Sequence, residues 1–376
     1  MREIVIVIAD LFLPPSSDDA SRASDVADSS ANAAGSSSAI SAPGLQHAAR
    51  FGQKRSLAGE GGWRAWLARS LGRHEWVTVP PAVIAAAALD SRSDSASTVW
   101  LATPLHRIAG LTSVHLDRRS LLRLSAEETQ GFVTDFNRTF GDDSTSFLRL
   151  HALPTGALLL EAPADMVATT TDPARALAFG LEDSLPKGPQ ATPFKRLGAE
   201  VEMWLHAHPL NTFRTRRGEL PVNAFWLWGG GRLGSGPQPS GVSQTSGAAR
   251  TSGAQLLGID PYLAGLAHLG GLPVHPLPSG WGDLPDVADN QRTILVAEIS
   301  PLLHSNPNWS VFDAMADLDR RFIAPALAAL HAGAVERLIL LVNDIELGVR
   351  RHDRRKFWRR PKSILAGLTS SATGKV

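Results

Sequence analysis

The sequence contains no cysteine among its 376 residues. This absence excludes a disulfide scaffold, a thiolate metal site and a catalytic thiol, so any nucleophile must be an oxygen or a nitrogen. It also agrees with a reducing compartment, and we therefore expect a cytoplasmic protein.

Long hydrophobic runs and a surplus of one charge are missing as well. The apolar run 4–9 is too short to span a membrane, and Asp10 follows it instead of a small-residue cleavage site. This run predicts a buried strand, and we expect no membrane partner. The 37 basic and 36 acidic residues give a net charge of +1, so no global field attracts nucleic acid, and we expect no such partner.

The composition that remains is that of a globular protein. Hydrophobic residues make up 43% of the chain and charged residues 19%, which favours a folded chain over a disordered one. A chain of this length holds two domains, or one large domain with an insertion. Two polar stretches, 16–44 and 234–254, lack hydrophobic periodicity, so we expect flexible inserts there.

Strands and helices alternate along the rest of the chain, which predicts an α/β fold with a doubly wound, mostly parallel sheet. The strand over 4–10 is apolar throughout and should lie in the middle of the sheet. Asp10 then lies at its carboxyl end, where α/β sheets bind ligands. The other predicted helices are 62–71, 80–89, 195–207, 262–269 and 311–332, and the other predicted strands are 222–228, 293–299 and 337–342.

Shorter strands surround one helix in the first half of the chain. The strands are predicted at 98–101, 110–116, 147–151 and 157–161, and the helix at 125–140. Ser125 and Glu128 are spaced as the capping box that opens such a helix. We therefore predict an inserted small α+β subdomain over 98–190. It divides the main α/β domain into a first part, 1–97, and a second part, 191–365, which a tail over 366–376 follows.

Several motifs resemble known proteins. The segment 221–232 (PVNAFWLWGGGR), together with the order of elements around it, resembles the archaeal-type cofactor-independent phosphoglycerate mutases of the alkaline-phosphatase superfamily. Four further motifs are similar to those of a bacterial family of regulatory proteins linked to pathogenicity factors, the E-type regulators, whose members are often described as phosphoglycerate mutases. These motifs are TPLH at 103–106, GLTSVHL at 110–116, DFNR at 135–138 and FWRR at 357–360.

The resemblance implies a site with two divalent metals and a phosphoryl-accepting serine. Carried over to this sequence, it places metal ligands at Asp10, His304, Asp344 and His352. Two expected ligands are absent, since Ser300 stands where the family has a carboxylate and Ile345 where it has an imidazole. No serine between residues 50 and 75 has the context of the nucleophile. The remaining four residues suit at most one divalent metal, Mn or Zn.

Two further sequence features are typical of binding sites. Gly229, Gly230, Gly231 and Arg232 follow a predicted strand, where glycine N–H groups and an arginine could hold an anion; the alternative is a plain loop. The run 350–362 (RRHDRRKFWRRPK) interleaves cations with an aromatic pair. We expect a protein partner or a phosphorylated ligand to contact it, with a solvated surface as the alternative. The contact residues would be Arg354, Arg355, Phe357, Trp358, Arg359 and Arg360.

These observations leave two hypotheses. In the first, the chain is a phosphoglycerate-mutase-like protein with a degraded two-metal site, which acts in regulation by binding a phosphorylated metabolite or a protein. In the second, it is an active metal-dependent mutase or phosphatase with a rearranged ligand set. The losses at Ser300 and Ile345 favour the first.

Overall fold

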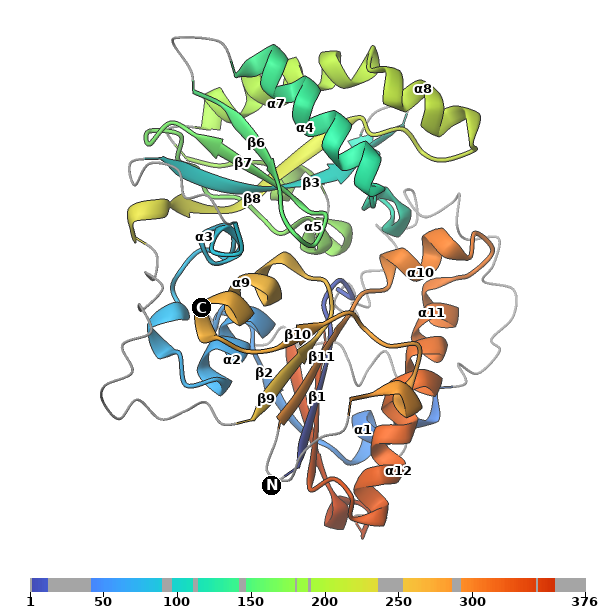
Figure 1. The fold of residues 1–376 in the computed structure, drawn as a ribbon. Coiled ribbons are helices and arrows are strands. Elements are labelled where there is room, and N and C mark those ends of the chain that lie inside the picture. The colour runs from blue at the N-terminus through green and yellow to red at the C-terminus, as the bar shows by residue number, and fades with distance from the viewer. Residues whose placement is uncertain are drawn as a thin grey trace.

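The structure is a computed structural model that describes residues 2–12, 42–89, 97–110, 114–141, 147–179, 181–188, 191–235, 253–285, 292–342 and 344–355. These residues form two layers, each built on its own sheet (Figure 1). The tail 366–376 and most of the two predicted inserts lie outside the described residues. No helix among the described residues has both the length and the apolar character needed to cross a membrane.

The lower layer is built on a seven-stranded sheet with the order β10-β9-β11-β1-β12-β13-β2. Five neighbouring strands are parallel, and β13 is antiparallel to both of its neighbours. The predicted strand at 4–10 is β1, and it lies inside the sheet as expected. The strands are β1 Glu3–Ile8, β2 Gln53–Ser56, β9 Ala254–Leu257, β10 Val274–His275, β11 Arg292–Ala297, β12 Arg337–Val342 and β13 Ile345–Arg350.

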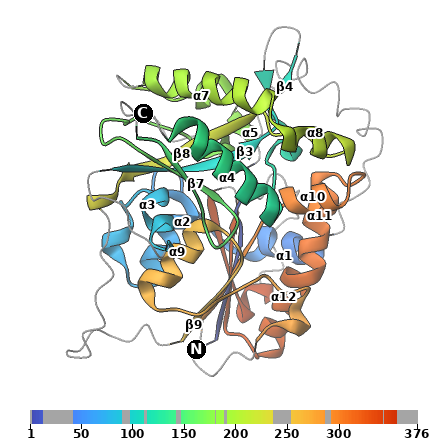
Figure 2. The ribbon, with the colours of Figure 1, turned by 45° about the horizontal axis from the view of Figure 1, so that its top comes forward.

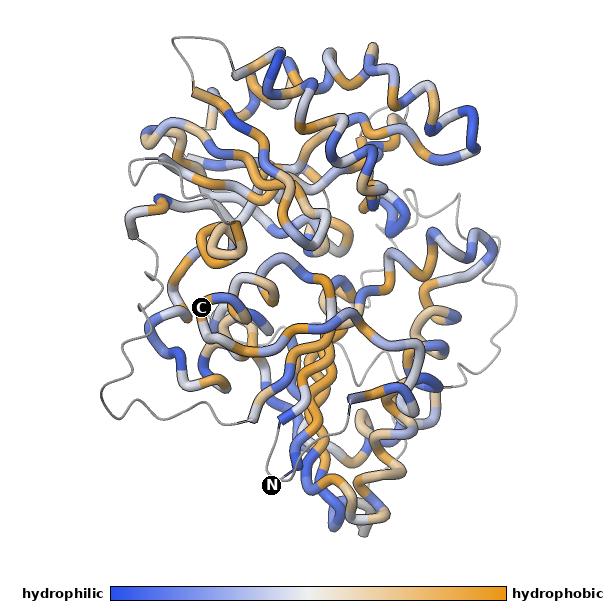
Figure 3. The backbone as a smooth tube through the Cα atoms, in the orientation of Figure 1, coloured by the Kyte–Doolittle hydropathy of each residue, from blue (hydrophilic) through white to orange (hydrophobic). Residues whose placement is uncertain are grey.

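Helices cover both faces of this sheet because its inner strands are apolar on both sides. Ile4, Ile6 and Ile8 contribute to the hydrophobic cluster on one face, whereas Val5 and Val7 contribute to the cluster on the other. The inner strands are accordingly hydrophobic along their length in Figure 3. The first face carries α1 Pro43–Phe51, α10 Ser300–Ser305, α11 Val311–Leu318 and α12 Ala324–Ala332; the second carries α2 Gly62–Ser70, α3 Pro81–Ala86 and α9 Pro261–Gly270.

The helix predicted over 311–332 is present but interrupted. A π-helical turn, Asp319–Ile323, separates α11 from α12. Pro325 has no N–H to continue an α-helical hydrogen-bond pattern, so the chain widens just before it. Within this turn the Asp319 carboxylate accepts hydrogen bonds from the N–H groups of Gly44, at 3.1 Å, and Leu45, at 2.6 Å. Because α1 begins at Pro43, the insert predicted to end at residue 44 ends earlier.

The upper layer is built on an antiparallel four-stranded sheet with the order β6-β7-β3-β8. In Figure 2 its helices α4, α7 and α8 lie over these strands. Ser125 and Glu128 form the predicted capping box of α4. The strands are β3 Thr98–Leu105, β6 Arg149–Ala152, β7 Leu158–Ala162 and β8 Ala224–Arg232, with a small hairpin of β4 Ile108–Ala109 and β5 Val114–His115; the helices are α4 Ala126–Phe140, α5 Pro173–Phe179, α6 Leu181–Ser184, α7 Ala191–His206 and α8 Pro209–Arg216.

The upper sheet extends past the predicted boundary at residue 190, because it includes β8. The edge strand β8 pairs with β3 from Leu105↔Ala224 to Thr98↔Arg232. Helix α7 packs into the same hydrophobic cluster as α4 and β7. Residues 191–235 therefore belong to the second sheet, because β8 completes it, and the chain returns to the central sheet only at β9. The upper layer is thus formed by residues 97–235. The Leu233 N–H donates to the Ser97 carbonyl at 3.0 Å, so the two ends of the segment 97–235 meet.

Candidate functional site

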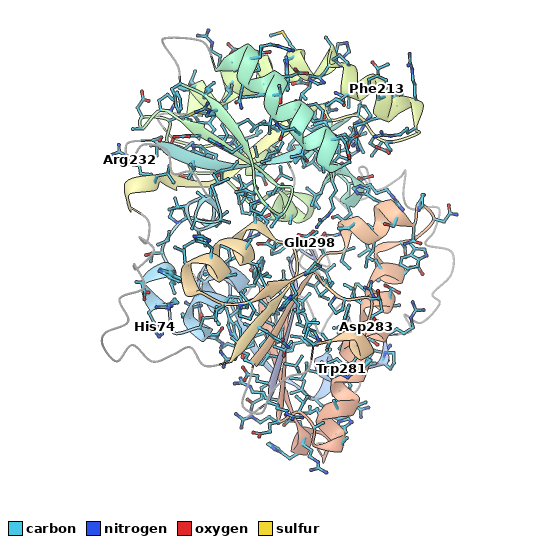
Figure 4. The ribbon with its side chains drawn as sticks, viewed as in Figure 1. His74, Phe213, Arg232, Trp281, Asp283 and Glu298 are labelled. Carbon is cyan, nitrogen blue, oxygen red and sulfur yellow. The ribbon has the colours of Figure 1, made fainter. Side chains whose placement is uncertain are left out.

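A cleft of about 190 Å³ lies between the two layers, at the carboxyl ends of the central parallel strands. Open α/β sheets bind their ligands at this edge. Asp10, Asp260 and Glu298 come from the ends of β1, β9 and β11, while Leu101, Leu158 and Trp228 come from the upper sheet. Figure 4 shows Glu298 between the two layers. The cleft thus combines mostly apolar walls with a few buried charges.

Asp10 is at the predicted strand end, but hydrogen bonds from its own chain use its carboxylate. One oxygen accepts from the Ile299 N–H at 2.6 Å, and the other accepts from the N–H and the hydroxyl of Ser300, at 2.7 and 2.6 Å. The carboxylate is buried, and it holds the start of α10 against the end of β1. Ser300 is thus a hydrogen-bonding partner of Asp10.

His304 and Asp344 are also engaged. The Nε2 atom of His304 is 2.8 Å from the Arg119 carbonyl, to which it donates. Asp344 occupies the turn between β12 and β13 with a φ of 56°, a left-handed conformation that Asp tolerates better than most residues. Its carboxylate pairs with Arg175 at 2.5 Å. The next residue, Ile345, is fully buried in the core.

His352 lies at the opposite end of the central sheet. Strand β13 runs from Ile345, which pairs with Val342 near the cleft, to Arg350, which pairs with Arg337 at the far edge. His352 follows that far end, and its side chain is 65% exposed. The structure therefore does not bring His352 together with the other three predicted ligands, and the metal-binding role of these residues stays a prediction. Among the residues that the structure describes, no three His, Asp or Glu side chains converge to hold a metal.

The donor atoms that remain do not fit a pair of divalent ions. Metal binding needs carboxylates whose lone pairs face the ion, and imidazoles that offer a free nitrogen. Asp10 instead faces N–H and O–H donors, and Asp344 faces a guanidinium. Arginine side chains therefore supply positive charge at this edge of the sheet.

The structure places arginines in and beside the cleft that no sequence pattern had marked as site residues. Arg64 pairs with Asp172 at 2.7 Å and with Asp260 at 3.4 Å, and it stacks on Trp63 and Trp228. Burial disfavours the charged form of Arg64. The ion pairs with Asp172 and Asp260 favour that form more strongly, so the pKa of the guanidinium is raised. Burial raises the pKa of the Asp260 carboxyl, and the positive charge of Arg64 opposes this shift.

A second set of arginines comes from the upper layer. Arg118 donates to the carbonyls of Asp10, at 2.9 Å, and Phe12, and Arg119 donates to those of Pro307 and Trp309. Arg118 and Arg119 lie in a short 3-10 helix, Arg118–Ser120, that opens with the capping box of Asp117, and Arg123 follows this helix. No sequence motif marks these arginines, so only the fold shows that they reach the lower layer.

Arg123 forms an ion pair with Glu298 in the lining of the cleft. Burial raises the pKa of the Glu298 carboxyl; Arg123 opposes this shift, and the neighbouring Asp10 and Asp260 add to it. The Arg123 side chain is 39% exposed and that of Arg64 only 15%. Arg123 is therefore the cation of this cleft that an incoming molecule reaches more easily.

The glycines at 229–231 lie inside β8, because this strand continues through Arg232 instead of ending at Trp228. A Cβ atom on Gly230 would lie 2.1 Å from the Trp100 ring, and one on Gly231 would lie 2.6 Å from Pro80. Close packing thus explains why these positions have no side chain. The loop expected there is absent, while the anion-binding role of these residues and Arg232 stays a prediction.

The basic run is described only in part. Arg350 ends β13, and a short 3-10 helix covers Arg351–Arg355. The side chains of Arg354 and Arg355 and the whole of residues 357–360 lie outside the described residues. The predicted contact with a partner or a phosphate therefore stays a prediction.

Solved structures that are distantly similar to this chain include two from archaeal sources. A cofactor-independent phosphoglycerate mutase from Thermoplasma acidophilum shares 15% identity at a TM-score of 0.37, with 98% of this chain and 95% of that chain covered. The PH0037 protein from Pyrococcus horikoshii shares 13% identity at a TM-score of 0.45, with 96% and 91% covered. No protein-family model matches the sequence, and no curated protein matches it. The structure itself shows a mixed α/β fold with a mostly parallel central sheet.

Proposed function

We propose that this chain is a phosphoglycerate-mutase-like regulatory protein that acts by binding and does not transfer phosphoryl groups. Its ligand is a phosphorylated metabolite or a protein partner, as in the resemblance to the regulators linked to pathogenicity factors. The cleft between the layers takes the metabolite, and the basic run beginning at Arg350 is the surface for the partner.

One observation carries this proposal. The residues that match metal-ligand positions of the mutases serve to hold the fold together. Asp10 anchors α10, Asp344 forms a turn and an ion pair with Arg175, and His304 bonds to the Arg119 carbonyl. A phosphoryl-transfer site needs its ligands and nucleophile to act as one unit, so the loss of several removes most of the rate.

A turnover assay with metal analysis tests the proposal. We expect purified protein, supplied with Mn²⁺, to convert 3-phosphoglycerate to 2-phosphoglycerate no faster than buffer does. We also expect a chelator to leave its melting temperature unchanged, because no bound ion contributes to folding.

The Asp344→Ala and Asp283→Ala variants provide the matched pair for this assay, since Asp283 is exposed and is not among the residues that line the cleft. Turnover that Asp344→Ala removes and Asp283→Ala keeps would establish the alternative, an active enzyme with a rearranged ligand set.

A further inference from the structure

Two imidazole rings face each other on the first face of the central sheet, outside the cleft. His47 lies on α1 and His331 on α12, and their ring centroids are 5.2 Å apart with an angle of 70° between the ring planes. The two helices pack together, and Leu45, Ala48 and Leu330 belong to one hydrophobic cluster between them (Figure 1). Neither histidine lines the cleft, so the pair is a separate feature of the fold.

The Nε2 atoms of both rings are shielded from solvent, and that of His47 has no hydrogen-bond partner among the described residues. A buried polar atom in this state costs free energy, and a bound ion or water molecule accounts for it. Burial lowers the pKa of the His47 ring, and so do His331 and the Arg50 guanidinium, whereas the Asp353 carboxylate raises it. The ring is therefore neutral near pH 7, which is the form that binds metal ions.

The distance between the rings agrees with a shared metal ion. Zinc binds an imidazole nitrogen at about 2 Å, so two imidazoles on one tetrahedral ion have ring centroids about 5 Å apart. The observed separation of 5.2 Å is close to this value. Edge-to-face packing of two rings also gives such a distance. Packing alone, however, leaves the buried Nε2 atom of His47 without a partner.

The position of His47 is fixed by contacts on both sides of it along α1. One turn earlier, the Asp319 carboxylate accepts hydrogen bonds from the N–H groups of Gly44 and Leu45. One turn later, the Phe51 ring packs against the imidazole with a centroid distance of 4.6 Å. The ring is thus held in place before any ion binds, which lowers the entropy cost of binding.

We infer that His47 and His331 bind one Zn²⁺ ion between α1 and α12 through their Nε2 atoms, with water molecules completing the tetrahedron. No third His, Asp or Glu converges on this place within the part of the chain that the structure describes. Binding is therefore weaker than at a structural site with four protein ligands. Protein dialysed against zinc-free buffer carries no ion there, so the chelator result expected for the proposed function still holds.

Calorimetric titration of the dialysed full-length protein with Zn²⁺ tests this inference. We expect about one ion per chain with a Kd of about 1–100 µM, measured in a buffer that does not bind zinc. His47→Gln and His331→Gln should each weaken binding about tenfold or more, because each removes one of the two protein ligands. His268→Gln is the control, since His268 is exposed on α9 at the other face of the sheet, and it should bind zinc like the unmodified protein.

A second measurement needs no variant and applies even if a substitution prevents folding, which melting curves recorded in chelator would reveal. Crystals of the unmodified protein soaked in zinc chloride should give an anomalous diffraction peak about 2 Å from both Nε2 atoms.

No zinc uptake, or a water molecule on Nε2 of His47 in zinc-soaked crystals, would overturn this inference. Zinc binding that His352→Gln removes and His47→Gln keeps would overturn it too, because the ion would then lie at the exposed His352. The turnover assay tests the proposed function separately, and its outcome does not depend on these results.

Discussion

Asp10 illustrates, at the scale of a single residue, how one buried carboxylate can hold two elements of the fold together. Its two carboxylate oxygens receive three hydrogen bonds from Ile299 and Ser300, and all three residues are buried. Removal of the carboxylate would leave two buried N–H groups without an acceptor, which costs about 1–3 kcal/mol for each group.

We therefore expect Asp10→Ala to lower the free energy of unfolding by about 3 kcal/mol, measured by urea denaturation near neutral pH. Asp283→Ala, at an exposed position, should change it by less than about 0.5 kcal/mol. If Asp10 were free to bind a metal, the metal-free Asp10→Ala protein would be as stable as the original or more stable, and that result would contradict the structural role.

Glycine positions in β8 lead to a prediction at the scale of one element. The ring of Trp100 fills the space beside Gly230, so an added methyl group must displace either the ring or the strand. We expect Gly230→Ala to destabilise the protein by about 1–3 kcal/mol in thermal or urea unfolding.

Gly198→Ala is the matched substitution, because no heavy atom lies within 4 Å of the added carbon and the residue is in the middle of α7. It should leave stability unchanged or raise it by up to about 1 kcal/mol. Equal effects of the two substitutions would show that packing does not explain the glycines of β8.

Elements with a regular hydrophobic pattern were predictable from sequence. The apolar run of β1, the capping box at Ser125 and the helical spacing after Val311 all predicted the observed elements within a few residues. The π-helical turn before Pro325 and the extension of β8 through three glycines were missed. Both depend on tertiary packing, around Asp319 and Trp100, which no local pattern reports.

The candidate site was less predictable than the fold. Asp10 was placed correctly because it follows an apolar strand, and its neighbour Glu298 follows another. His352 was misplaced because the offset along the chain does not reveal that β13 turns back and carries it to the far edge. The arginines have no sequence signal, because they reach the cleft from a turn and helices of both layers.

At the scale of the whole molecule, helix α3 joins the two layers by hydrophobic packing against β3 and β8, and ion pairs and main-chain hydrogen bonds add to this contact. Arg119, Arg123 and Arg175 of the upper layer contact the lower layer, and each layer also has hydrophobic clusters of its own. Charged and polar contacts of this kind hold an orientation but contribute less to folding than a core does.

Because one hydrophobic cluster of the upper layer lies wholly within residues 97–235, we expect this segment, expressed alone, to fold into the four-stranded sheet and its helices. A cooperative thermal transition and dispersed amide resonances would confirm it. A fragment that ends at residue 190, the boundary predicted from sequence, lacks β8 and should remain unfolded under the same conditions. If the shorter fragment folded as well as the longer one, β8 would not be needed to complete this sheet.

The contact between the two ends of this segment has a consequence for the history of the protein. Thr98 pairs with Arg232, and the next residues outward, Ser97 and Leu233, are joined by a hydrogen bond. A gene segment that encodes 97–235 could thus be gained or lost in one recombination event, since the chain on either side needs only a short connection to close the gap. The lower layer would keep its strand order through such an event, while all the cleft residues that come from the upper layer would be exchanged together.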